Sequence, residues 1–242
     1  MRTAYERVRA KVPKPVKRAL SPLIRPFVGK YRSELNYWRN RHRSEGGKFA
    51  NDWYEKTMLA MADEADASFL KGKVVADFGC GPRGSLAWLE DATKIGIDVL
   101  NTAYSKEFPN DFRRHGMIYV TSTEELIPMP DKFVDVMFSM NSLDHTANLQ
   151  AICSEILRVM KPDAELIASF NLHEPPTAAE PQVLTEELLE EVLLRHFEPH
   201  NVRLGRHHEG DTYAEMGTGK STYVKGKQGY MWFRGRRSTL RT

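Results

Sequence analysis

Short apolar runs alternate along this chain with longer, more polar stretches whose residues favour helices. A run with apolar residues on both faces suits a strand buried in a parallel sheet, and Val74–Ala76 is such a run. The same reasoning predicts further strands at 94–99, 117–121, 133–140 and 165–170. Helices are expected between them, at 85–90, 101–108, 148–160 and 185–195. This order indicates an α/β fold with a mostly parallel sheet.

The C-terminal part of the chain departs from the alternation. Val202–Leu204 and Gly229–Phe233 read as a final antiparallel pair, and the polar, glycine-rich segment between them, 205–227, reads as a loop. With this pair the sheet has seven predicted strands.

The N-terminal part divides into two segments. Residues 1–30 form a basic arm whose four prolines argue against one long helix. Residues 31–71 have helical spacing with many aromatic residues and a break at Gly46-Gly47, and residues 72–242 form the main domain.

Charge is distributed unevenly over the chain. Residues 1–48 hold 14 Lys and Arg against 3 Asp and Glu, whereas residues 49–242 hold 21 against 29. An acidic main domain disfavours a broad nucleic-acid surface there. For the basic arm three roles stay open: packing on its own body or on a second subunit, contact with an anionic membrane, or contact with nucleic acid.

Two cysteines, Cys80 and Cys153, form no disulfide framework, which fits a reducing cytosol. No apolar run approaches the ~18 residues of a membrane-spanning helix. We therefore expect a cytoplasmic protein that contacts the inner face of a membrane if the arm is an anchor.

The chemistry of the chain centres on the turn after the first strand. Asp77-Phe78-Gly79-Cys80-Gly81 follows that strand, and Gly84 then opens the expected helix. Glycines let a ligand lie against the main chain, and free N–H groups at a helix start favour a polar or anionic group. Asp98 ends the second strand 17 residues after Gly81, a spacing used to bind ribose hydroxyls.

These residues resemble a known family. Asp77-Phe78-Gly79-Cys80-Gly81 is similar to the D-x-G-x-G signature of class I S-adenosylmethionine-dependent methyltransferases. Pro128–Phe138 resembles the approach to the family's fourth strand, and Glu155–Pro162 its helix end ahead of the fifth. The resemblance covers roughly residues 72–234. It implies a Rossmann-like, seven-stranded, mostly parallel sheet with a final antiparallel strand, preceded here by an N-terminal helical arm.

The resemblance also implies S-adenosylmethionine as cofactor. Asp98 would hold the ribose, Asp77 would face the methionine ammonium, and Thr123 stands where relatives often carry an Asp beside the adenine. The cofactor-binding residues we predict are Asp77, Gly79, Cys80, Gly81, Arg83, Gly84, Asp98, Val99, Thr123, Glu124 and Asn141.

Other residues are candidates for contacting the acceptor and removing its proton. Helices ahead of the first strand commonly form a lid in this family, so Tyr37, Trp38, Phe49 and Trp53 are candidate lid contacts. His145 is the candidate general base because its ordinary pKa suits proton removal near neutral pH. Asp144 beside it either orients it or caps the next helix. His173, in the loop after the fifth strand, is the second candidate for the base and a candidate contact of the acceptor. We predict no metal.

The predicted activity is methylation of a hydroxyl on a small molecule or glycan, lipid-linked glycans included. Met140-Asn141-Ser142-Leu143 is not the [DN]-P-P-[YF] sequence that relatives use on base amines, so a nucleic-acid substrate is disfavoured. Two alternatives stay open: a non-catalytic methyltransferase-like subunit that binds a partner, and a nucleic-acid methyltransferase that uses the basic arm. A homo-oligomer is also compatible with the sequence.

Overall fold

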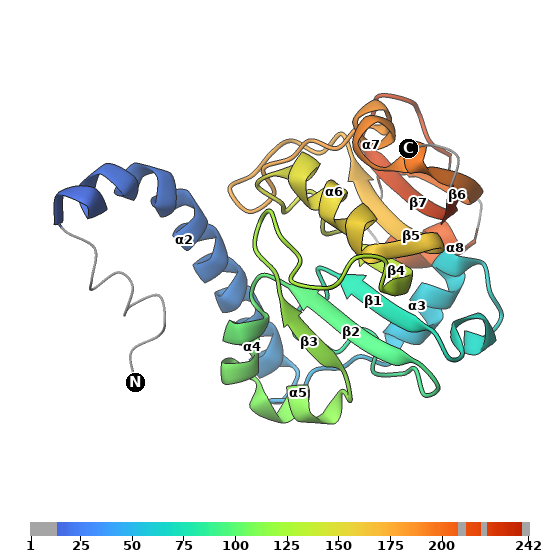
Figure 1. Cartoon of the computed structure of the whole chain (residues 1–242), viewed down its shortest axis with the longest axis horizontal. Helices are drawn as coiled ribbons and strands as arrows, with labels where there is room; N and C mark the ends of the chain where they lie inside the picture. Colours follow the sequence, from blue (N-terminus) through green and yellow to red (C-terminus); the bar gives the residue numbers. More distant parts are fainter. Residues whose placement is uncertain (1–13, 208–211, 219–221, 239–242) are drawn as a thin grey trace.

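A computed structural model describes residues 14–207, 212–218 and 222–238 of the chain (Figure 1). Residues 1–13 of the predicted arm, and 208–211 and 219–221 of the predicted loop, lie outside the described residues.

A seven-stranded sheet in the order β3-β2-β1-β4-β5-β7-β6 forms the centre of the fold. Strands β3, β2, β1, β4 and β5 are parallel, and β7 runs antiparallel to both β5 and β6. The predicted fold is therefore confirmed. The strands are β1 (Val74–Phe78), β2 (Thr93–Asp98), β3 (Ile118–Thr121), β4 (Val134–Met140), β5 (Met160–Leu172), β6 (Phe197–Arg206) and β7 (Gly229–Arg237).

Both faces of this sheet are buried, as the doubly apolar strands predict. On β1, Ala76 and Phe78 face a core shared with helices α6 (Leu149–Val159) and α7 (Glu186–Val192). Val75 faces the opposite core, under helices α3 (Trp53–Ala62) and α8 (Thr212–Gly217). The remaining elements are α2 (Lys14–Ser44), α4 (Asn101–Glu107), α5 (Pro109–Arg114) and two short 3-10 turns, Ala67–Leu70 and Leu194–His196.

Helix α2 contradicts one expectation. It runs unbroken through the prolines at 15, 22 and 26 and across the boundary placed between residues 30 and 31. Pro15 is the second residue of the helix, where a missing N–H costs nothing, but Pro22 and Pro26 each remove an internal hydrogen bond. Figure 1 shows this part of α2 bending and extending away from the body, while its C-terminal half lies against α4 and α5.

The helix expected at 85–90 is also absent. Residues 81–88 form successive turns instead, with i to i+3 hydrogen bonds from Ala87 N to Gly84 O and from Leu89 N to Leu86 O. The prediction was wrong because only 14 residues separate β1 from β2 (79–92), and several of them make the glycine turn.

Other local predictions are confirmed. Asn148 caps α6 by accepting from Ala151 N, and Thr185 caps α7 by accepting from Leu188 N. Gly46 and Gly47 adopt positive φ angles and separate α2 from α3. None of the helices among the described residues has both the length and the apolarity to cross a membrane.

Candidate functional site

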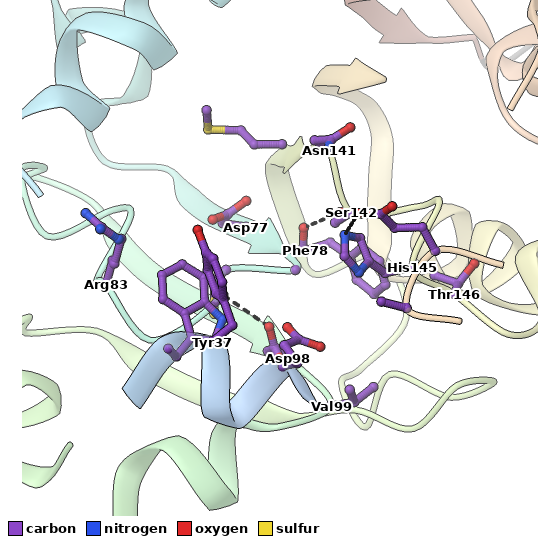
Figure 2. Close-up of a pocket in the computed structure, with 18 of the residues that line it drawn as sticks. Tyr37, Asp77, Phe78, Arg83, Asp98, Val99, Asn141, Ser142, His145 and Thr146 are labelled. Atoms are coloured by element: carbon purple, nitrogen blue, oxygen red, sulfur yellow. Dashed lines mark hydrogen bonds and ion pairs between the residues drawn. The ribbon is translucent and has the colours of Figure 1, made fainter. Parts of the chain in front are cut away.

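A cavity of about 710 Å³ opens at the carboxyl ends of β1, β2 and β4, beneath helix α2. The chain builds β1, β2 and β3 in one direction across the sheet and then returns to place β4 on the other side of β1. The loops on either side of this reversal diverge and leave room for a ligand. Figure 2 shows Asp77, Asp98, Asn141 and His145 around this cavity, with Tyr37 of α2 at its rim.

Two glycines of the turn after β1 allow the close approach of neighbouring segments. Gly79 has φ +77°, and a Cβ there would lie 2.2 Å from Cβ of Ser142. At Gly81 (φ +55°) a Cβ would lie 3.2 Å from the indole of Trp38. Gly84 also needs a positive φ, but it packs against His115 and is outside the cavity wall. Gly79 and Gly81 therefore line the cavity with bare backbone, and Gly84 is structural.

Asp77 presents an unused carboxylate oxygen to the site. Its Oδ2 accepts a hydrogen bond from the Ser85 hydroxyl at 2.5 Å, whereas its Oδ1 is buried and has no partner among the described residues. Burial raises the pKa of Asp77 to about 7, and the Ser85 hydrogen bond opposes this rise. A cationic group in the cavity would satisfy Oδ1 and favour the ionised form.

Asn141 presents a second unused oxygen. Its backbone is left-handed (φ +47°), and its N–H donates to the Ser169 carbonyl at 3.0 Å. Its Oδ1 is buried without a partner among the described residues. Asn tolerates this backbone conformation better than most residues, so the strand end can turn sharply here.

Asp98 ties the glycine turn to the end of β2. Its Oδ2 accepts from Gly81 N at 3.1 Å and its Oδ1 from Leu100 N at 2.8 Å. Burial and the nearby Glu34 carboxylate raise the pKa of Asp98, although the two backbone hydrogen bonds lower it. Each oxygen keeps a lone pair that can accept from a ligand hydroxyl.

The guanidinium of Arg83 and the thiol of Cys80 donate hydrogen bonds to other residues of the protein. The Arg83 guanidinium donates to the Ala50 carbonyl at 2.6 Å, pairs with Glu45, and lies over the rings of Trp38 and Phe49. The Cys80 thiol donates to the Asn101 side chain at 3.7 Å, and burial raises its pKa well above the usual range. Both line the cavity, but Arg83 connects the turn to the segment after α2.

Thr123 and Glu124, predicted near the adenine, line the cavity with their polar atoms already engaged. The Thr123 hydroxyl accepts from the N–H groups of Glu125 and Leu126. The Glu124 carboxylate accepts from Tyr31 (2.5 Å), Lys30 (3.2 Å) and Ala147 N (2.9 Å). Glu124 therefore fastens helix α2 to the loops after β3 and β4, while Val99 and Ser122 supply neighbouring wall.

His145 lies between two carboxylates at the cavity wall. Its Nε2 is 3.5 Å from Oε1 of Glu180 and 4.0 Å from Oδ1 of Asp144. Asp144 is buried outside the wall, and its Oδ1 accepts from the His145 backbone N–H. Burial raises the pKa of Asp144, and the adjacent histidine opposes this rise. The three side chains bring one potential ligand atom each within 4.8 Å of one another, so the absence of a metal stays a prediction.

The lid candidates divide into two groups. Tyr37, Trp38 and Trp53 line the cavity. Phe49 is buried behind the wall, against Trp38, His42 and Phe108. His173 is outside the wall as well, with its Nε2 2.6 Å from Oε2 of Glu186.

Several wall residues were missed from the sequence. They come from segments with no motif of their own, and their placement depends on how α2, α8 and the loop after β5 pack over the strand ends. The missed wall residues with ionisable or hydroxyl groups include Lys30, Glu34, Tyr54, Ser122, Glu180 and Tyr213.

The bare glycine backbone, the unpartnered Asp77 oxygen and the Asp98 carboxylate fit the ammonium and ribose of S-adenosylmethionine. Residues 76–168, less than half of the chain, match the family model described as "Methyltransferase domain". A 108-residue stretch, 40% of this chain, is 33% identical to Botryococcene C-methyltransferase of Botryococcus braunii and spans 28% of that protein's length.

Solved structures share the fold at low sequence identity. A SAM-dependent methyltransferase from Aquifex aeolicus has a TM-score of 0.51 and 20% identity, over 78% of this chain and 100% of that one. The [4+2]-cyclase SpnF has a TM-score of 0.55 and 20% identity, over 76% of this chain and 80% of that one.

Residues 76–168 thus match a methyltransferase domain model, and they lie on a Rossmann-like sheet. A SAM-dependent methyltransferase shares this fold, and S-adenosylmethionine is the cosubstrate that the residues at the strand ends fit. The likeness to a cyclase shows that this fold by itself does not decide the reaction.

Proposed function

We propose that this protein is a class I S-adenosylmethionine-dependent methyltransferase that methylates a hydroxyl oxygen of a small molecule or glycan. The observation that carries the proposal is the Asp77 Oδ1, which is buried without a partner in the described part of the chain. It lies near the end of β1, in the same cavity as Asp98 at the end of β2. A buried carboxylate oxygen without a partner is costly, and a ligand cation removes that cost.

This chain's residues would hold the cosubstrate by complementary charge and hydrogen bonding. Asp77 would accept from the methionine ammonium, Asp98 from ribose hydroxyls, and Gly79 and Gly81 would leave room for the ligand along the backbone. Trp38 covers the turn at Gly81, and Tyr37 packs edge-on against it and lines the cavity. Bound S-adenosylmethionine supplies an activated methyl group, so the protein's own task is to position the acceptor and remove its proton.

His145 is the residue we assign to proton removal. It lines the cavity, and its Nε2 faces the Glu180 carboxylate, which would stabilise the imidazolium formed when the hydroxyl proton is accepted. The sequence Met140-Asn141-Ser142-Leu143 at the end of β4 supports an oxygen acceptor over a base amine.

The N-terminal arm supports a membrane-proximal acceptor as part of this proposal. Residues 14–33 contain six Lys and Arg and no Asp or Glu, with apolar residues at helical spacing between them. This part of α2 extends away from the body in Figure 1. A basic, amphipathic helix binds anionic lipid surfaces through both charge and apolar contacts.

Cosedimentation of the full chain with vesicles tests the arm. Vesicles containing phosphatidylglycerol should retain the protein and pure phosphatidylcholine vesicles should not, and replacing Lys17, Arg18 and Arg25 by Ser should abolish retention. If the anionic vesicles retain nothing while the protein binds RNA with a steep salt dependence, the arm is a nucleic-acid contact.

Calorimetric titration with S-adenosylhomocysteine tests the cosubstrate site. We expect micromolar binding by the wild type and at least tenfold weaker binding by Asp98→Asn and Asp77→Asn. Asp131→Asn is the matched control, because Asp131 is exposed and outside the cavity wall. A folded wild type that fails to bind would sink the enzyme proposal and favour the non-catalytic partner subunit.

A further inference from the structure

The cavity is wider than the groups assigned to the cosubstrate require. It extends from Thr123 beside β3 to Tyr213 of α8, which lies over β5 and β7. Asp98 and Asp77 end β2 and β1, and β4 and β5 follow in the sheet. Because adjacent strands are ~4.8 Å apart, the β5 end lies roughly 14 Å from the Asp98 strand. None of the groups assigned to the cosubstrate lies at the β5 end, so the acceptor can bind there.

Aromatic rings build one wall of the β5 end. Trp53 stacks on Tyr54 with ring centroids 4.1 Å apart and an interplanar angle of 24°. Tyr213 lies 6.4 Å from Trp53 at an angle of 53°, and its hydroxyl is 3.0 Å from Oγ of Ser169. Trp53 nevertheless stays 39% exposed within the cavity wall. One face of its indole is covered by Tyr54, so a single face is offered to a ligand.

Polar groups line the same cavity as these rings. Oδ1 of Asn141 is buried without a partner among the described residues, and His145 and Glu180 stand 3.5 Å apart. Amide and carboxylate oxygens accept from hydroxyl groups. The cavity therefore combines a one-sided aromatic wall at its β5 end with hydrogen-bond acceptors.

We propose that the β5 end of the cavity is an acceptor subsite for a pyranose ring, with Trp53 as the platform beneath the ring and Tyr213 tilted beside it. A pyranose has an apolar face of C–H groups and hydroxyls around its edge, which matches this wall and its polar neighbours. A flat aromatic acceptor would be better served by two parallel rings, and Tyr213 is tilted by 53° from Trp53. The assignment rests on the proposed methyltransferase function and narrows its substrate class to a sugar.

The transfer balances with the residues present. A new bond forms between the sugar oxygen and the methyl carbon while the sulfur–methyl bond breaks. The electron pair of that bond stays on sulfur and neutralises its positive charge. The hydroxyl proton passes to His145, with Glu180 beside it as a positioning residue.

Saturation-transfer NMR on the full chain with bound S-adenosylhomocysteine tests the subsite without requiring turnover. The probes are the methyl glycosides of glucose, galactose and mannose, with p-cresol and benzylamine for comparison. We expect saturation of glycoside ring protons by the wild type. Trp53→Leu should weaken glycoside binding about tenfold, whereas Trp53→Phe should keep it within about threefold.

Phe133→Leu is the matched control, because Phe133 is 38% exposed and outside the cavity wall, and it should change nothing. Unchanged S-adenosylhomocysteine affinity in each variant shows that the site is folded. The subsite assignment is overturned if no glycoside binds, if Trp53→Leu leaves glycoside binding intact, or if only cresol or benzylamine binds in a Trp53-dependent way. In those cases intact S-adenosylhomocysteine binding leaves the methyltransferase proposal standing, whereas its loss in the wild type refutes both.

Discussion

Glu124 is the residue through which helix α2 is fastened over the cosubstrate site. One carboxylate oxygen accepts from Tyr31 at 2.5 Å and Lys30 at 3.2 Å, and the other accepts from Ala147 N at 2.9 Å. The interaction is largely shielded, since the Glu124 side chain is 17% exposed and that of Lys30 only 7%. Burial and Glu124 together raise the pKa of Tyr31 above its ordinary range, so Tyr31 stays a donor.

Glu124→Gln removes the charge but keeps the size of the side chain. A hydrogen bond to a charged partner is worth about 1.5–3 kcal/mol. A glutamine amide has one acceptor oxygen where the carboxylate has two, so it cannot accept from Tyr31 and Lys30 on one side and from Ala147 N on the other. We expect the free energy of unfolding to fall by roughly 2–4 kcal/mol, unless α2 detaches first and limits the loss. In either case backbone amides of residues 30–44 should exchange faster with solvent.

The assay is a double-mutant cycle with Tyr31→Phe, read by chemical denaturation and by hydrogen exchange. A coupling energy of about 1 kcal/mol or more is expected for residues in direct contact. The control is Glu107→Gln, which breaks an exposed pair with Arg39 on the same helix and should cost at most about 0.5 kcal/mol. A coupling energy near zero with unchanged exchange in α2 would refute the reasoning.

Three further predictions follow from the strand ends. Gly79→Ala should lower stability by several kcal/mol or abolish S-adenosylhomocysteine binding, because its Cβ would lie 2.2 Å from Cβ of Ser142 at φ +77°; calorimetry and thermal denaturation check this, and a neutral result would mean that the turn relaxes. Burial raises the pKa of Asp77 to about 7 in the ligand-free protein, against about 3.9 in the unfolded chain. The protonated carboxyl therefore contributes stability that is fully present below about pH 3.9 and is lost as the pH rises through about 7. Asp77→Asn should therefore flatten the loss of stability between pH 4 and 8 measured by urea titration, and an unchanged pH profile would contradict the assignment. His145→Gln should lower kcat about 100-fold or more while S-adenosylhomocysteine affinity stays unchanged; activity that EDTA abolishes and a divalent cation restores would instead make Asp144, His145 and Glu180 a metal site.

The sequence by itself determined the sheet and the ends of its first two strands. Both are local properties. Apolar residues on both faces of 74–76 require burial from two sides, and the glycines after Asp77 permit a turn that other residues resist. Asp77 and Asp98 therefore lie in one cavity as the sequence predicted, since the carboxyl ends of parallel strands meet at one edge of the sheet.

Helix predictions failed where local rules competed with chain length and packing. The segment 85–90 has helical composition, but the short connection between β1 and β2 holds it in turns. Pro22 and Pro26 weaken a helix without ending it, so α2 continues from Lys14 to Ser44. The first outcome depends on where β1 ends and β2 begins, and the second on a helix that tolerates the two lost hydrogen bonds.

The tertiary structure alone decided which polar groups remain available to a ligand. Arg83 and Glu124 have the chemistry of ligand-binding residues, yet both are engaged in fastening the α2 region, to Glu45 and to Tyr31. Glu180 and Tyr213 come from segments with no motif and reach the cavity through long-range packing. A buried charged side chain pairs with the charged or hydrogen-bonding groups that the fold places next to it. The sequence therefore indicates which residues are able to bind, and only the assembled fold shows which are free to do so.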